Sequence, residues 1–150
     1  MINNASKAAQ EELKRKGYKL TGPRIAIINY LAESQEHPDM QQIFAGIRAE
    51  YPGIGMATVY RTLGLLLELD ILRAITVNKN QLLYELKKPD DHHHHLVCTG
   101  CSQIIEFGSC SFKHISSEIE TVTRYSIEDH TLEAYGLCPQ CQGDFQVERG

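Results

Sequence analysis

The hydrophobic and polar positions of residues 5–70 follow the period of helices, interrupted by short breaks. Helix-forming residues fill positions 5–16, and Gly17 is typical of a helix C-terminus. Thr21 fits the N-cap of a second helix, with Pro23 in its first turn. The apolar residues of this second helix recur at helical spacing, at Ile25, Ile28 and Leu31.

Two more helices are predicted before residue 70. Pro38-Asp39 opens the third, whose apolar residues are Met40, Ile43, Phe44 and Ile47. After a break at 52–55, the fourth covers 57–67, with an inward stripe of Val59, Leu63, Leu66 and Leu67. Tyr60, Arg61 and Gly64 fall largely off that stripe, so the outer side of the helix carries an aromatic ring and a guanidinium.

A pair of strands follows the helices. The runs 71–77 and 82–86 are joined by an Asn-rich turn, Asn78 to Gln81, which predicts a hairpin. Helices followed by a hairpin predict a winged helix-turn-helix whose fourth helix reads DNA. On this helix Tyr60 suits thymine methyl groups and Arg61 suits guanine or phosphate. Packing of Tyr60 against the hairpin is the alternative.

The C-terminal part of the chain predicts a small mixed domain. Leu96-Val97, 104–107 and 131–137 are predicted strands, and 111–124 is a predicted helix. The apolar residues expected to face inward on this helix are Phe112, Ile115, Ile119 and Val122. Such a small sheet leaves an edge available, and pairing of that edge across a two-fold axis predicts a homodimer.

The net charge of −4 is divided unevenly along the chain. Residues 1–83 contain ten Lys or Arg and eight Asp or Glu, whereas 84–150 contain five and eleven. Positive side chains gather without an intervening acid at Lys14, Arg15, Lys16, Lys19 and Arg24. This basic patch suits the phosphate backbone of DNA, and a solvated helix face is the alternative. No apolar run is long enough to span a membrane, so no membrane partner is expected.

Two Cys-x-x-Cys pairs lie in the C-terminal half, Cys98 with Cys101 and Cys138 with Cys141. Two intervening residues let one tight turn aim both thiolates at a single ion, so the four predict a tetrahedral structural Zn2+ site. Redox-active pairs and disulfides are the alternatives. Neither pair has a βαβ context and no signal peptide is present, which favours zinc and a cytoplasmic protein.

Four consecutive histidines precede the first cysteine pair. If they begin the strand at Leu96-Val97, alternate side chains point to opposite faces. His93 and His95 then form one imidazole pair, and His92 and His94 form another, so the run predicts ligands for two sites. A solvated histidine loop is the alternative.

Together these patterns predict an α+β fold in two domains. Residues 1–86 are expected to form a winged-helix DNA-binding domain, 87–91 a hinge, and 92–150 a small α/β domain for dimerisation and metal binding. The expected partners are double-stranded DNA and a second copy of the chain, because a dimer suits the reading of symmetric DNA.

Short motifs carry a family resemblance along nearly the whole chain. They are Lys19-Leu-Thr-Gly-Pro-Arg24, Glu36-His-Pro38, Ala57-Thr-Val-Tyr-Arg-Thr62, Leu83-Tyr-Glu85, the segment 92–101, Ile105-Glu-Phe107 and Tyr135-Gly-Leu-Cys-Pro-Gln-Cys141. The order and spacing of these motifs resemble those of the ferric uptake regulator family of bacterial metal-sensing repressors. The resemblance implies a dimer that binds an operator when a regulatory divalent metal is bound.

The resemblance also implies roles for individual residues. The structural zinc ligands correspond to Cys98, Cys101, Cys138 and Cys141. The main regulatory site corresponds to His37, Glu85, His93, His95 and Glu106, and such mixed ligands suit Fe2+, Mn2+, Zn2+ or Co2+. A further metal site corresponds to His92, His94 and His130. The expected DNA contacts are Lys19, Thr58, Tyr60 and Arg61.

Two positions depart from the family pattern or lack a role in it. Where many members place an acidic ligand in the further metal site, this chain aligns Lys113. Cys110 has no assigned partner and is interpreted as a buried thiol rather than a ligand.

The identity of the regulatory metal is predicted from Glu85 and Glu106. Peroxide sensors that resemble this chain usually carry aspartates at these positions, and zinc sensors often add a hinge cysteine that 71–91 lacks. We therefore expect an iron-responsive repressor, with zinc, manganese or peroxide sensing as alternatives.

Functions outside transcription agree less well with the sequence. A zinc hydrolase or deaminase would need an open metal position and a general base, and it would leave the basic patch and the Tyr60-Arg61 helix unexplained. A protein–protein zinc module predicts no salt-dependent affinity for DNA. We therefore expect that the chain is not an enzyme.

Overall fold

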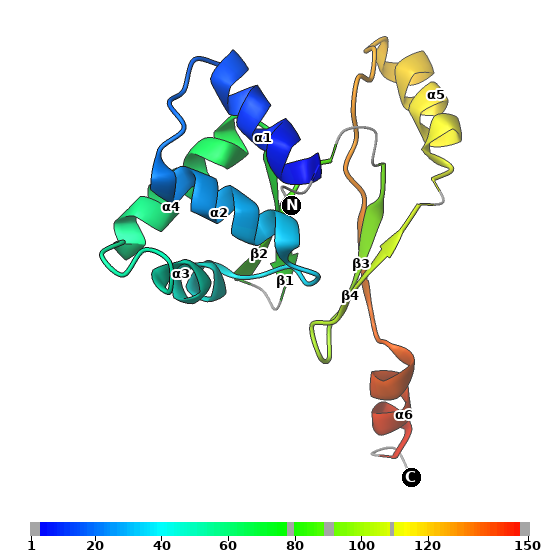
Figure 1. The fold of residues 1–150 in the computed structure, drawn as a ribbon. Helices are drawn as coiled ribbons and strands as arrows, with labels where there is room; N and C mark the ends of the chain where they lie inside the picture. Colours follow the sequence, from blue (N-terminus) through cyan, green and yellow to red (C-terminus); the bar gives the residue numbers. More distant parts are fainter. Residues whose placement is uncertain (1–3, 78–79, 89–91, 109, 148–150) are drawn as a thin grey trace. The chain divides into compact units, whose positions relative to one another are not determined.

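The structure, a computed structural model, describes residues 4–77, 80–88, 92–108 and 110–147. The chain divides into two compact units, Met1–Asp91 and His92–Gly150, which we call the N-terminal and C-terminal units. Figure 1 shows their helices and strands. Residues 89–91 of the expected hinge lie outside the described residues. Among those that are described, no helix is both long and apolar enough to cross a membrane.

The described residues of the N-terminal unit form four helices and a hairpin, as predicted (Figure 1). The elements are α1 (Asn4–Arg15), α2 (Gly22–Glu33), α3 (Met40–Arg48), α4 (Met56–Glu68), β1 (Leu72–Val77) and β2 (Gln81–Leu86). β1 and β2 pair in antiparallel fashion. Asn78 and Lys79 of the predicted turn lie outside the described residues.

A single apolar core joins the elements of the N-terminal unit. Leu13, Ile27, Ile43 and Leu63 are buried and come from α1, α2, α3 and α4 in turn. Gly46 lets α3 approach α2, because a Cβ there would overlap the ring of Tyr30. The packing of α4 on this core fixes the direction in which its outer side faces.

The C-terminal unit contains a three-stranded sheet with the order β4-β3-β5. Its elements are β3 (His94–Cys98), β4 (Ile104–Phe107), α5 (Phe112–Thr123), β5 (Glu133–Gly136) and α6 (Pro139–Val147). β3 runs antiparallel to β4 and parallel to β5. In Figure 1, α5 and α6 lie beyond opposite ends of this sheet. The sequence reading missed α6, although Pro139 at its first position is a common helix start.

The prediction that the apolar residues of α5 face inward is wrong within a single chain. No residue of α5 is buried, and Ile115, Ile119 and Val122 are 53%, 40% and 82% exposed. Phe112 is partly buried because its ring stacks on His130, with centroids 3.8 Å apart. The helical spacing identified an apolar stripe correctly, but periodicity carries no information about which surface covers such a stripe.

Candidate metal centres and DNA-binding surface

The four paired cysteines converge at one point of the C-terminal unit. β3 ends at Cys98, Cys101 follows in the next turn, and Cys138 and Cys141 lie at the start of α6. Their sulfur atoms all lie within 4.8 Å of one another, and the Cys101 and Cys138 sulfurs are 3.8 Å apart. Zn–S bonds of about 2.3 Å in a tetrahedron require S···S distances of about 3.8 Å. The geometry therefore fits a zinc ion.

The electrostatics of this four-cysteine cluster also suit a cation. The pKa of Cys98 is lowered to about 6, chiefly because the backbone N–H of Cys138 donates to Cys98 Sγ at 3.2 Å and further backbone N–H groups add to the effect. Interaction with the Cys138 side chain raises the pKa of Cys141 to about 12. Four neighbouring thiolates repel one another unless a cation compensates their charge. All five cysteines of the chain are free, so disulfides are not formed here.

Gly100 is required by the close approach of the two cysteine pairs. A Cβ at this position would lie 2.9 Å from Cys141 Sγ and 3.1 Å from Cys141 Cβ. Any larger residue would therefore push the second pair away from the first.

The four histidines divide into two pairs, as the strand alternation predicts. The ring centroids of His93 and His95 are 4.9 Å apart, and those of His92 and His94 are 4.7 Å apart. His95 lies opposite Glu106 in the β3–β4 register, and residues directly opposite each other share a sheet face. One face of the sheet therefore presents His93, His95 and Glu106 together.

A second group of candidate ligands lies within the N-terminal unit. His37 Nε2 is 3.8 Å from Glu85 Oε2, and the two side chains are only 12% and 11% exposed. The loop that carries His37 is held against β2, because the Tyr84 N–H donates to the Pro38 carbonyl and Asp39 forms an isolated bridge with Leu83. The sequence reading missed Arg73, whose guanidinium lies 3.9 Å from Glu85 Oε2.

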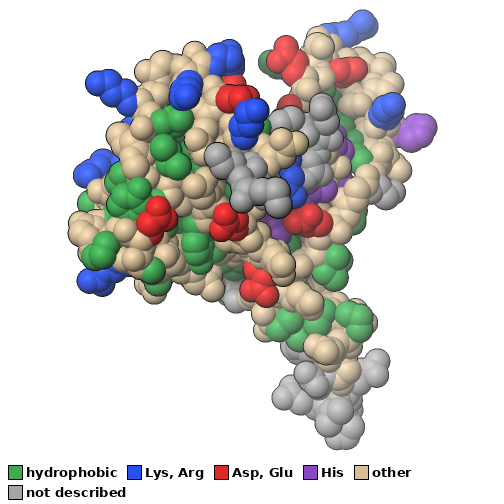
Figure 2. Space-filling model, in the orientation of Figure 1, with side chains coloured by type: hydrophobic (Ala, Val, Ile, Leu, Met, Phe, Trp, Pro, Cys, Tyr) green, Lys and Arg blue, Asp and Glu red, His purple; other side chains and the backbone are tan. Residues whose placement is uncertain are grey.

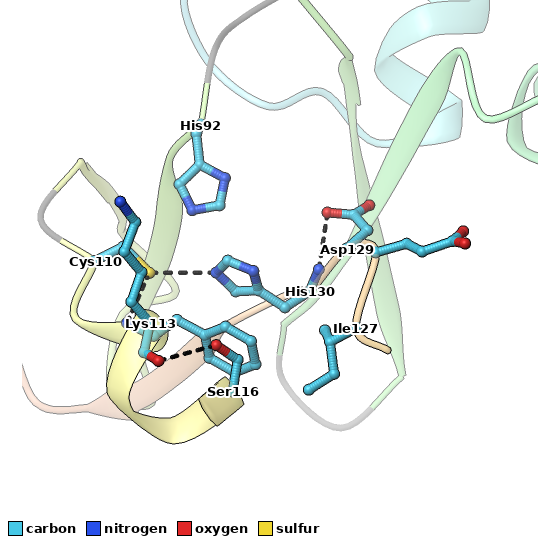
Figure 3. Close-up of a pocket in the computed structure, with 9 residues that line it drawn as sticks. His92, Cys110, Lys113, Ser116, Ile127, Asp129 and His130 are labelled. Carbon is cyan, nitrogen blue, oxygen red and sulfur yellow. Dashed lines mark hydrogen bonds between the residues drawn. The ribbon is translucent and has the colours of Figure 1, made fainter. Parts of the chain in front are cut away.

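The other histidine pair belongs to a cluster that the sequence identified only in part. Ligand atoms of His92, His94, His130 and Cys110 all lie within 4.8 Å of one another. Figure 3 shows Cys110 directed at the His130 ring, with Sγ 3.2 Å from Nε2. The interpretation of Cys110 as a buried thiol without a partner is wrong, since the residue is only partly buried and contacts His130.

The predicted DNA-reading residues lie on the surface of the N-terminal unit. Tyr60 is 68% exposed, which favours contact of its ring with DNA bases over packing against the hairpin. Arg61 is also exposed, and its Nη2 lies 3.4 Å from Thr58 Oγ1. Lys19 is exposed, and its carbonyl accepts a hydrogen bond from Arg24 Nη1. α4 therefore presents a phenol and a guanidinium to solvent.

The basic patch is weaker than its sequence indicates. Glu12, one turn earlier on α1, pairs with Arg15 at 2.6 Å and contacts Lys16 at 3.7 Å. Figure 2 shows a red acidic side chain among the blue Lys and Arg side chains that lie close together at the top of the view. The remaining positive charge suits contacts to separate phosphates rather than one concentrated site.

Comparisons with known proteins extend over both units. The ferric uptake regulator family matches residues 15–135. The ferric uptake regulation protein of Bacillus subtilis is 33% identical over 145 residues, which cover 95% of this chain and 97% of that protein. The peroxide operon regulator of the same organism is 30% identical over 141 residues, covering 94% and 96%. The structure of the ferric uptake regulator from Francisella tularensis with iron has a TM-score of 0.71 at 28% identity, covering 84% of this chain and 96% of that one.

The family assignment decides between the classes of function that the sequence left open. Members of this family are metal-responsive, DNA-binding transcriptional regulators and not enzymes, so hydrolase or deaminase activity is excluded. The mixed helix and sheet structure agrees with the winged helix and dimerisation domain of solved relatives. The chain belongs to the ferric uptake regulator family.

Proposed function

We propose that the chain is an iron-responsive repressor that binds operator DNA as a homodimer when its regulatory site holds a metal. The family resemblance assigns one ligand set to residues of both units, and the geometry within each unit supports it. The N-terminal unit brings His37 next to Glu85, and the C-terminal unit places His93, His95 and Glu106 on one sheet face. These imidazole and carboxylate ligands suit a divalent transition metal.

The mechanism follows from the position of these ligands in the chain. A single ion bound by both parts would link the unit that carries the reading helix to the unit that forms the dimer. In the dimer, that link sets the spacing of the two α4 helices for successive major grooves. Metal then stabilises the arrangement that binds DNA, and by linkage DNA must tighten metal binding by the same factor.

The choice of iron rests on Glu85 and Glu106. Peroxide sensors that this chain resembles usually carry aspartates there, so glutamates favour reversible metal binding. The Francisella tularensis relative was solved with iron. Zinc, manganese and peroxide are the alternative signals. Peroxide is among them because the peroxide operon regulator of Bacillus subtilis is nearly as similar to this chain as the ferric uptake regulation protein of that organism is.

A homodimer is supported by the exposed apolar stripe of α5. Ile115, Ile119 and Val122 form a surface that a second copy of the chain would cover. A structural zinc ion bound by Cys98, Cys101, Cys138 and Cys141 would hold α6 and β3 together and so maintain the sheet next to this surface. Because operator DNA is the target, we place the protein in the cytoplasm.

The test is metal-dependent DNA binding by the full-length protein. A duplex selected from a random pool with the metal-loaded protein would be labelled with fluorescein and titrated by anisotropy. We expect Fe2+ under anaerobic conditions, or Mn2+ as a stable substitute, to tighten binding by about 5- to 150-fold, the usual range of allosteric coupling. Equal affinity in the presence of a chelator would contradict the proposal. A response to Zn2+ alone would identify a zinc sensor instead.

A further inference from the structure

A cysteine completes the histidine cluster formed by His92, His94 and His130. Cys110 stands just before α5, and its sulfur lies with the three imidazoles in a group whose ligand atoms are all within 4.8 Å of one another. Cys110 and His130 line a pocket of the C-terminal unit, and Figure 3 shows the two side chains directed at one another. Four ligands of this kind at these distances meet the coordination number of a tetrahedral metal site.

Neighbouring aromatic rings hold the imidazoles in place. Phe112 stacks on His130 with its ring plane within 9°, and Phe107 packs against His94 with centroids 5.4 Å apart. The His130 ring lies 4.7 Å from that of His92 and 5.3 Å from that of His94. The cluster is therefore assembled by β3, β4, and the segments before α5 and β5, rather than by one flexible loop.

The surroundings of Cys110 favour a thiolate ligand. The Phe112 N–H at the start of α5 donates to Cys110 Sγ at 3.4 Å, and a helix N-terminus stabilises negative charge. Lys113 lines the same pocket and adds a positive charge. Glu128 and Asp129 also line it, but neither is among the four grouped ligands.

We infer that Cys110 is a metal ligand and that it makes this cluster a zinc site. A thiolate is a soft ligand, and three imidazoles with one thiolate in a tetrahedron suit Zn2+ better than the harder Fe2+ or Mn2+. On binding, the Cys110 thiol loses its proton to solvent and its sulfur lone pair forms the bond to the metal. The inference goes beyond the proposed function, since it concerns a second centre inside the C-terminal unit and can be tested without DNA.

Cobalt(II) provides the direct test, because a thiolate bound to cobalt produces a charge-transfer band in the near ultraviolet. The full-length protein, with zinc retained at the four-cysteine site, would be freed of exchangeable metal by mild chelation and titrated with CoCl2. Since the other cysteines are occupied by zinc, a new band reports Cys110. We expect the band in the unmodified protein and its loss in Cys110→Ser. We also expect that variant to bind zinc at this site at least about tenfold more weakly.

Two further variants separate ligation from local folding. His114→Ala removes an exposed α5 histidine outside the cluster and should keep the band. Cys110→Asp should bind metal without the band and shift preference from zinc towards manganese. The unmodified protein loaded with cobalt at both the regulatory site and the histidine cluster, yet without a band, would overturn the inference. Unchanged zinc affinity of the histidine cluster in Cys110→Ser would also overturn it. A band that grows only as the structural zinc is released would also overturn it. The spectrum of the unmodified protein decides the question even if a variant fails to fold.

Discussion

The replacement Cys138→Ser tests whether zinc provides the folding energy of the C-terminal unit. Within one chain, the apolar side chains buried in the described part of this unit are Val97, Cys98 and Cys138. Burial of a side chain such as Val97 contributes about 1.5–3 kcal/mol. Structural zinc contributes about 10–16 kcal/mol in small zinc domains, so the metal outweighs the apolar core.

We therefore expect Cys138→Ser to lose zinc, the fold of the C-terminal unit and the dimer together. The loss should exceed about 4–5 kcal/mol, a range reached by few single substitutions apart from those that remove a metal. The N-terminal unit should stay helical, because its core of residues such as Leu13, Ile27 and Leu63 belongs to it alone. Metal analysis, light scattering and circular dichroism would measure the three effects.

Cys110→Ser is the matched control for this experiment. Cys110 lies outside the four-cysteine cluster, so this variant should retain one structural zinc ion per chain and remain a dimer. The reasoning fails if Cys138→Ser is also a zinc-loaded dimer of unchanged thermal stability. It also fails if Cys110→Ser loses the zinc ion that mild chelation leaves in the unmodified protein, because that ion would then not be tied to the four clustered cysteines.

Two further predictions concern the N-terminal unit. Tyr60→Ala and Arg61→Ala should each cost about 1–3 kcal/mol of operator binding and relax specificity, whereas Lys19→Ala should weaken binding to all sequences and lower the salt slope by about 1. Fluorescence anisotropy with operator and scrambled duplexes at several salt concentrations distinguishes these effects. Unchanged selectivity in Tyr60→Ala and Arg61→Ala would mean that α4 is not the helix that reads DNA. Gly46→Ala should destabilise the unit by at least about 1–3 kcal/mol, because its Cβ would overlap the ring of an α2 tyrosine. Gly64→Ala, whose Cβ meets nothing within 4 Å, should not lower thermal stability, and similar melting temperatures for the two variants would contradict the packing argument.

The elements of the N-terminal unit could be predicted because their signals are local. Asp39 caps α3 and exchanges hydrogen bonds with Gln42, so a helix start is encoded within four residues. The stripe on α4 likewise determines which residues are buried and leaves Tyr60 outside. Such features depend on neighbours along the chain and need no knowledge of the fold.

Two of the features that the sequence reading missed, the contact of Cys110 with His130 and the exposure of α5, depend on distant contacts. Cys110 and His130 are twenty residues apart, and their contact arises because α5 and the segment before β5 return to the histidine end of β3. The apolar stripe of α5 was assigned inward because its spacing resembles that of a core helix, yet the structure leaves it exposed. α6 begins at Pro139, between Cys138 and Cys141. The sequence reading interpreted this segment as a metal-binding turn and therefore missed the start of the helix.

The variant His37→Ala tests most directly whether one metal ion links the two units. His37 lies next to Glu85 in the N-terminal unit and outside the four-cysteine cluster. The variant should therefore keep its zinc, its fold and its dimer. Operator binding would be measured by fluorescence anisotropy with and without added metal, for this variant and the unmodified protein. We predict that His37→Ala loses most of the metal-dependent gain in affinity. A full metal response in His37→Ala would contradict a regulatory link through this residue.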